Sequence, residues 1–142
     1  MYFQSNIKYT QQDEQGRQKT INESYLFNAL DYTDAETQTH EHIAQNWPDF
    51  QLIAIKKQNF QEVFLIENGD EAFYKAKVSY LTFNEATQTD KKTSYWMLLN
   101  AEGVREAYES LRSRLGPVND YEIESVIKTN ILEVVPNQTT AE

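Results

Sequence analysis

One stretch of the chain occurs twice, 71 residues apart. The first copy, at residues 49–64, reads DFQLIAIKKQNFQEVF, and the second, at residues 120–135, reads DYEIESVIKTNILEVV. Five positions are identical, and most others keep their aromatic, apolar or polar character. A repeat of this kind strongly constrains the fold, because two similar sequences adopt similar local structures. The spacing therefore predicts an internal tandem duplication.

The same shift places the start of the chain over its middle. The matched residues are Tyr2, Phe3, Ile7 and Tyr9, which overlie Phe73, Tyr74, Val78 and Tyr80. The opening MYFQSN resembles the remnant of a cleavable tag, but its agreement with the repeat indicates that it belongs to the fold. Residues suited to a buried position alternate here with residues that are mostly polar, which is typical of a strand with one buried face.

Both halves are predicted to have the order strand, strand, helix, strand, strand. In the first half, a hairpin turns at the polar residues 11–18. A helix follows from Thr33, whose spacing to Glu36 is that of a capping box, and ends before Pro48. Strands at 50–56 and 60–66 complete the half, joined by a turn at 57–59.

The second half repeats this order. Its hairpin turns at residues 84–92, its helix stops at Gly116, and strands follow at 121–127 and 131–135. The apolar residues of the helix are Val104, Ala107, Tyr108, Leu111 and Leu115.

These elements predict an α+β protein with antiparallel sheets related by a pseudo-twofold axis. We expect one domain over residues 1–142, with repeats at 2–66 and 73–135, a linker at 67–72 and a flexible tail at 136–142. The last strand of each half carries apolar residues on both faces, so we expect it to lie in the centre of a sheet. The two sheets are expected either to pack together or to be continuous.

Composition excludes several classes of protein. The chain has no cysteine, which excludes disulfides, thiolate zinc sites and cysteine nucleophiles and fits a cytoplasmic location. No apolar run reaches the roughly 20 residues of a membrane helix, and no signal-peptide pattern opens the chain, so neither membrane insertion nor export is expected. The net charge of -9 argues against whole-surface attraction to nucleic acid.

Four segments resemble a known family. They read YFQSNIKY, YLFNALDYTDAE, FYKAKVSY and NDYEIESVIKTNILEVVP, and together they extend over nearly the whole chain. The chain is similar to an uncharacterised domain-of-unknown-function family of about 150 residues from gut bacteria and their phages. The resemblance implies an accessory protein of a phage or mobile element, and it supplies no catalytic residues.

The sequence contains few candidates for chemistry. His40 and His42 are two residues apart, so they point in different directions on a helix, and a solvated helix face is the simpler interpretation than a metal site. Glu62 and Glu133 occupy matching positions, so twofold symmetry could pair their carboxylates; the alternative is a polar strand position beside Lys57 or Lys128. No phosphate loop, nucleophile elbow or metalloprotease motif is present. We therefore expect no enzyme, no cofactor and no metal.

The hairpins carry local positive charge interleaved with aromatic residues, a pattern used to bind single-stranded nucleic acid. The candidate ligand-binding residues are Tyr2, Lys8, Phe73, Lys75, Lys77, Lys91 and Lys92. An ordinary exposed face with solubilising lysines would look the same. The first functional hypothesis is therefore a non-enzymatic module that binds a protein partner or itself. The alternative is a binder of single-stranded nucleic acid or a nucleotide.

Overall fold

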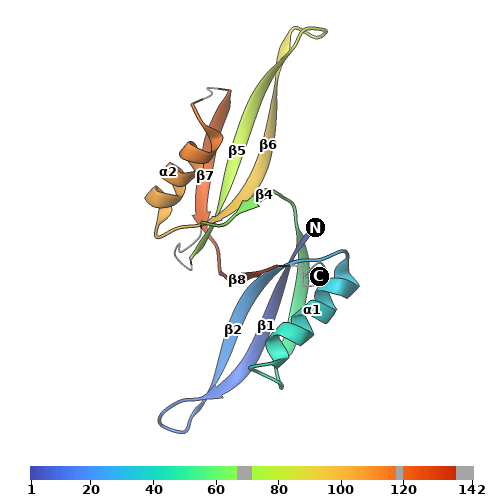
Figure 1. Ribbon diagram of the computed structural model, residues 1–142, viewed down its shortest axis with the longest axis vertical. Coiled ribbons are helices and arrows are strands. Elements are labelled where there is room, and N and C mark those ends of the chain that lie inside the picture. Colours follow the sequence, from blue (N-terminus) through green and yellow to red (C-terminus); the bar gives the residue numbers. More distant parts are fainter. Residues whose placement is uncertain (67–71, 118–119, 137–142) are drawn as a thin grey trace. The chain divides into compact units, whose positions relative to one another are not determined.

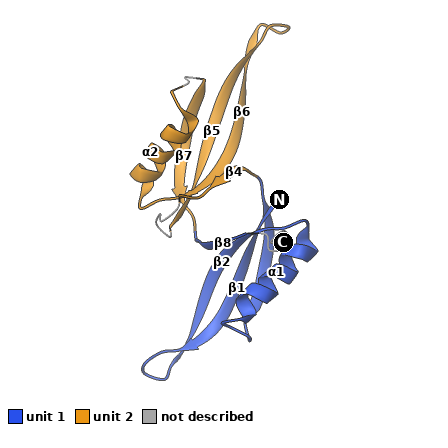
Figure 2. Ribbon diagram, viewed as in Figure 1, with its two compact units in different colours: residues 1–59, 130–142 blue, residues 60–129 orange. Residues whose placement is uncertain are grey.

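The computed structural model describes residues 1–66, 72–117 and 120–136. The predicted linker at 67–72 and tail at 136–142 lie almost entirely outside these residues. The protein is α+β, with two helices and two four-stranded sheets among the described residues (Figure 1). The chain divides into two compact units, residues 1–59 with 130–142 and residues 60–129 (Figure 2). These units do not coincide with the sequence repeats.

The first unit contains a sheet with strand order β3-β1-β2-β8. Its strands are β1 (Tyr2–Gln12), β2 (Gln18–Asn28), β3 (Gln51–Gln58) and β8 (Ile131–Val135), and its helix is α1 (Tyr32–Ala44). The tag-like opening of the chain is part of β1, where Phe3 is buried. The prediction that this segment belongs to the fold is therefore correct.

The second unit contains a sheet with strand order β4-β6-β5-β7. Its strands are β4 (Phe60–Phe64), β5 (Phe73–Asn84), β6 (Thr89–Asn100) and β7 (Tyr121–Lys128), and its helix is α2 (Val104–Leu115). The elements correspond to those of the first unit in order and register. A bulge interrupts β1–β3 pairing after Asn6, and another interrupts β5–β7 pairing after Lys77, which is 71 residues further on.

The sheets are mixed rather than antiparallel as predicted. β8 pairs parallel with β2, and β4 pairs parallel with β6. Both strands lie at an edge of their sheet, so the expectation that they are central is wrong. β4, which comes from the first sequence repeat, completes the sheet of the second unit. β8, which comes from the second repeat, completes the sheet of the first unit.

The connection between β3 and β4 explains this exchange. Only Asn59 separates the two strands, whereas the shortest common hairpin loop has two residues, so the predicted turn at 57–59 is wrong. The Cα atoms of Gln58 and Phe60 are at most roughly 7 Å apart. The position filled by β8 lies three strand spacings from β3, roughly 14 Å away. β4 therefore cannot complete the sheet that contains β3.

Each helix covers one face of the sheet in its own unit. α1 begins at Tyr32, one residue before the predicted Thr33, because Asp31 rather than Thr33 is the N-cap and accepts a hydrogen bond from the backbone N–H of Asp34 at 2.8 Å. α2 ends at Gly116 as predicted, and the φ of 81° at that residue is a backbone conformation that favours glycine.

Apolar side chains fill the space between each helix and its sheet. In the first unit the buried residues of these cores include Phe3, Ile7, Tyr25, Phe27, Ala35 and Ile43. In the second unit they include Tyr74, Ala76, Val78, Met97, Ala107 and Leu111. The helical residues Val104 and Tyr108, which were predicted to share the apolar face, are instead exposed by 53% and 43%.

One buried polar pair distinguishes the two cores. Ser5 and Thr39 are both 0% exposed, and their hydroxyl oxygens are 2.7 Å apart. Thr39 donates its proton to the carbonyl oxygen of Ala35 at 2.7 Å, so Ser5 must donate to Thr39. The matching positions of the second unit hold Ala76 and Leu111, which are apolar.

We predict that Ser5 and Thr39 are energetically coupled. Thr39→Val leaves the Ser5 hydroxyl without its acceptor and should lower the free energy of unfolding by about 1–3 kcal/mol. Ser5→Ala with Thr39→Val removes both polar groups and should cost less than the sum of the single substitutions. Denaturant unfolding of the four proteins measures the coupling, and additive losses would contradict it.

Candidate binding surface

Each sheet has a face turned away from its helix, which we call the open face. In the second unit, pleat alternation places Lys75, Lys77, Ser79, Leu81 and Phe83 of β5 on this face. Their partners on β6 are Leu98, Trp96, Ser94, Lys92 and Asp90, and of these ten residues Leu98 and Ser79 are buried. Cations and apolar side chains therefore share one continuous face of a two-stranded ribbon.

The structure separates the predicted ligand-binding residues of this unit into three groups. Lys75, Lys77 and Lys92 lie together on the open face. Lys91 pairs with Thr82 and so lies on the opposite face. Phe73 is buried, with 9% of its surface exposed, and is not available to a ligand in the way that was predicted.

Glu124 occupies the centre of the lysine group. It is the extra residue of β7 at the bulge that follows Lys77, which turns its side chain toward the open face. Its carboxylate accepts a hydrogen bond from Ser79 Oγ at 2.6 Å and another from Lys92 Nζ, and Lys77 Nζ lies 3.7 Å away. The hydrogen bond from Lys92, followed by that from Ser79, lowers the pKa of Glu124 below its ordinary value.

This arrangement changes the charge expected for the surface. The three lysines of the open face are matched by Asp90 and Glu124 and by Glu122, which pairs with Ser79. The face is therefore close to neutral instead of basic. Opposite charges held within a few ångströms attract a phosphate backbone much less than unpaired lysines do.

Lys75 makes a different contact. Its ammonium lies over the ring of Trp96, 4.9 Å from the centroid. Sequence reasoning missed Trp96 as a surface residue, because its position beside Lys75 and Lys77 depends on the pairing register of β5 and β6. The period of a strand places Trp96 and Met97 on opposite faces of β6, but residues 95–99 are apolar or aromatic throughout, so the sequence gives no signal for which of them faces the helix.

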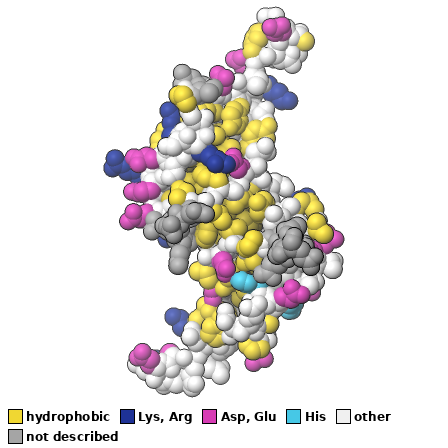
Figure 3. Space-filling view, viewed as in Figure 1, with side chains coloured by type: hydrophobic (Ala, Val, Ile, Leu, Met, Phe, Trp, Pro, Cys, Tyr) yellow, Lys and Arg dark blue, Asp and Glu magenta, His cyan; other side chains and the backbone are white. Residues whose placement is uncertain are grey.

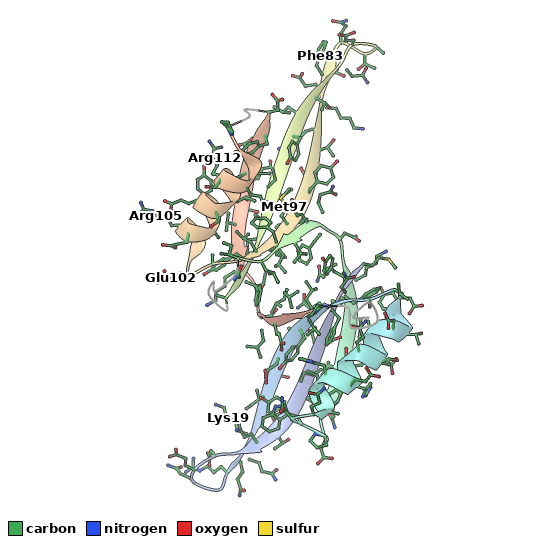
Figure 4. All side chains as sticks on the ribbon, in the orientation of Figure 1. Lys19, Phe83, Met97, Glu102, Arg105 and Arg112 are labelled. Carbon is green, nitrogen blue, oxygen red and sulfur yellow. The ribbon has the colours of Figure 1, made fainter. Side chains whose placement is uncertain are left out.

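The β5–β6 hairpin extends beyond the rest of its sheet (Figure 1). β7 pairs with β5 from Tyr74 to Tyr80, and residues 81–84 continue as a two-stranded arm with residues 89–92. Leu81 and Phe83 lie on the same side of this arm and are 57% and 58% exposed. Figure 4 labels Phe83 near the tip, and Figure 3 shows hydrophobic side chains at this end of the hairpin.

The corresponding arm of the first unit is polar. Thr10 and Gln12 occupy the positions that match Leu81 and Phe83, and all of residues 10–20 are exposed. The apolar pair is therefore not a requirement of the hairpin itself.

The open face of the first unit carries amide side chains in place of the lysines. The Gln58 side chain donates to Gln4 at 3.0 Å, and Gln4 donates to Asn130 at 3.3 Å. Of the predicted ligand-binding residues, Tyr2 and Lys8 lie on this face. Lys8 also lines a polar pocket of about 210 Å³.

Glu62 and Glu133 lie in different units, and each has a helical partner. Arg114 of α2 donates to Glu62 through Nε at 2.8 Å and through Nη2, and its guanidinium carbon lies 5.1 Å from the ring centroid of Phe64. Glu133 lies 3.0 Å from Nε2 of His42 in α1. Neither carboxylate pairs with Lys57 or Lys128, so both glutamates connect the edge strand of a sheet to the helix of the same unit.

The two histidines have different neighbours. His40 lies beside Phe50, with 5.1 Å between ring centroids, whereas His42 contacts Glu133. Within residues 1–66, 72–117 and 120–136, no three carboxylate or imidazole side chains gather in a way that could hold a metal ion. In the same part of the chain, no helix has the length and apolar character needed to cross a membrane.

Fold and surface together define an α+β protein built from two mixed sheets, each with one helix and an open face. A family described as a domain of unknown function (DUF4494) matches residues 1–137, and the chain belongs to this family. The match confirms that the chain belongs to an uncharacterised domain family. No curated protein and no solved structure matches the chain.

We predict that Lys92 controls the titration of Glu124. Because the pKa of Glu124 is lowered, the interactions of its carboxylate are present above the ordinary carboxyl pKa and are lost as the pH falls through the lowered value. Lys92→Gln removes the largest cause and should raise the pKa of Glu124. Carboxyl-carbon NMR measures it, with Lys91→Gln as a control that should leave the titration unchanged.

Proposed function

We propose that this protein is a non-enzymatic module that binds another protein through the arm at residues 81–92. The observation that supports this most is the exposure of Leu81 and Phe83 by 57% and 58% on one side of the arm. Two adjacent apolar side chains on a projecting ribbon form a patch that a protein partner can cover. Thr10 and Gln12 at the matching positions show that the fold does not require such a patch.

The neutral character of the open face supports a protein partner over nucleic acid. Lys77 and Lys92 both contact Glu124, and Asp90 lies opposite Phe83. Interspersed charges of both signs around apolar residues are suited to the polar rim of a protein interface. A phosphate backbone would instead require cations without acidic neighbours.

Three further parts of the proposal concern origin and setting. We propose that the chain arose by internal tandem duplication, which is supported by the 71-residue offset between β4 and β8 and between the two bulges. The absence of cysteine supports a cytoplasmic location. A role as an accessory protein of a phage or mobile element rests on the family resemblance alone.

Binding of single-stranded nucleic acid is the second candidate. The observation in its favour is Lys75 above Trp96, with Lys77 beside Trp96 on the neighbouring strand. A partly exposed aromatic ring with flanking cations can stack a base and contact its phosphates.

Our first prediction from this proposal uses a photo-crosslinking amino acid at position 83. We expect it to form a protein adduct in the expression host, because Phe83 lies on the interacting side of the arm. The same group at position 12, on the polar arm, is the matched control and should form little adduct. Adding Leu81→Thr should reduce the adduct at position 83. Equal adducts at both positions, or none at position 83, would refute the proposal.

Our second prediction separates the two candidates. Glu124→Gln leaves Lys77 and Lys92 without a carboxylate, so it should strengthen any single-strand binding and make it more sensitive to salt. Fluorescence anisotropy with a labelled single-stranded oligonucleotide measures this, with Glu85→Gln on the hairpin turn as a control of equal charge change. We expect neither the parent protein nor Glu124→Gln to bind tightly at physiological salt. Tight binding by the parent that is lost on Lys75→Glu and Lys77→Glu would favour nucleic acid instead.

A further inference from the structure

The edge strand β8 comes from the second sequence repeat but completes the sheet of the first unit. It is the last described strand, and its pairing with β2 extends from Ser24 to Phe27. Ile131 and Val135 anchor it, with exposures of only 5% and 2%. The first sheet therefore depends on this strand to bury part of its apolar surface.

The connection that precedes β8 is short and fixed at one end. Thr129 is tied to the second unit, because its backbone N–H and its hydroxyl both donate to the carbonyl oxygen of Phe73, at 2.9 and 2.8 Å. Asn130 is then the residue at which the chain leaves that unit. The fourth position of the second sheet is filled by β4 and lies three strand spacings from β7, roughly 14 Å away. β8 therefore cannot fill that position, and it pairs with β2 in the sheet of the first unit instead.

Nothing in this local geometry requires the accepting sheet to belong to the same chain. A second copy offers the same β2 edge and the same His42 partner for Glu133. We propose that two copies exchange β8, so that each copy completes the first sheet of the other, with Asn130 as the hinge. Exchange of an identical element is a low-cost route to a dimer, and it is favoured at high protein concentration.

The strand β4 is not expected to exchange in this way. β4 is the first strand of the second unit, and the whole of this unit is one stretch of sequence, residues 60–129. Its anchors include the two hydrogen bonds from Arg114 to Glu62. The side chain of Asn100 also accepts from the N–H of Ile66 at 2.7 Å and donates to its carbonyl oxygen at 3.1 Å. β4 therefore provides an internal control for β8.

A disulfide trap identifies the source of β8. The chain has no cysteine, and Leu26 pairs with Val134 across β2 and β8. After refolding of Leu26→Cys with Val134→Cys at high concentration and oxidation, we expect a covalent dimer on a non-reducing gel. Refolding at low concentration should give mainly internally linked monomer. Val63→Cys with Leu98→Cys traps β4 on β6 at the matching register pair and should give monomer at both concentrations.

A second measurement needs no cysteine. Chains with and without ¹⁵N are refolded together, and native mass spectrometry detects mixed dimers. His42→Ala should speed the interconversion of monomer and dimer by a factor of roughly two to five, the effect of losing one partly exposed hydrogen bond. It should leave the final dimer fraction unchanged, because monomer and dimer form the same contact. Arg114→Ala should alter neither quantity.

Several outcomes would overturn the proposal. One is the absence of dimers at every concentration in both experiments. Another is a dimer whose Leu26→Cys and Val134→Cys pair is linked only within each chain. The arm takes no part in this exchange, so Leu81→Thr should leave it unchanged, and failure of the proposed arm function would not affect it.

Discussion

A single residue between two strands determines how both sheets are completed. Asn59 alone connects β3 to β4, which leaves no room for a hairpin, so the chain continues directly from one unit into the next. The fourth position of the first sheet lies on the far side of β1 and β2 and is filled by β8. The matching connection through Thr129 and Asn130 returns the chain to the first unit. Each unit consequently contains a strand encoded by the other half of the sequence, and neither sheet is complete without both halves.

The two units keep this framework while their exposed and buried polar groups differ. At the helix–sheet contact, Ser5 and Thr39 form a buried hydroxyl pair where the second unit has Ala76 and Leu111. The partner of the edge-strand glutamate is His42 in one unit and Arg114 in the other. The open faces carry amides in the first unit and a lysine–glutamate group in the second. These differences lie at positions where the fold accommodates side chains of different chemistry.

Local patterns predicted most elements but not their partners. Alternation along β1 and β5, the polar turns and the glycine after α2 were enough to place the hairpins and the end of the second helix, because these features depend on residues close in sequence. The capping residue was misplaced, since Thr33 and Asp31 both satisfy the local preference for an N-cap. The lysines of the candidate surface were identified, but Glu124 and Trp96 were not, because a bulge and a strand register bring them beside those lysines. The face that the sequence predicts to be basic is therefore close to neutral in the structure.

By itself, the sequence determined the number, order and type of the elements and the relation between the two halves, because periodicity and a 71-residue offset are properties of the chain alone. Only the tertiary structure decided that the last strand of each repeat is a parallel edge strand in the other unit. It also decided that Glu62 and Glu133 contact side chains of α2 and α1 instead of each other. Strand pairing is a contact between residues far apart in sequence, and an amphipathic strand records that one face is buried without recording which edge it joins.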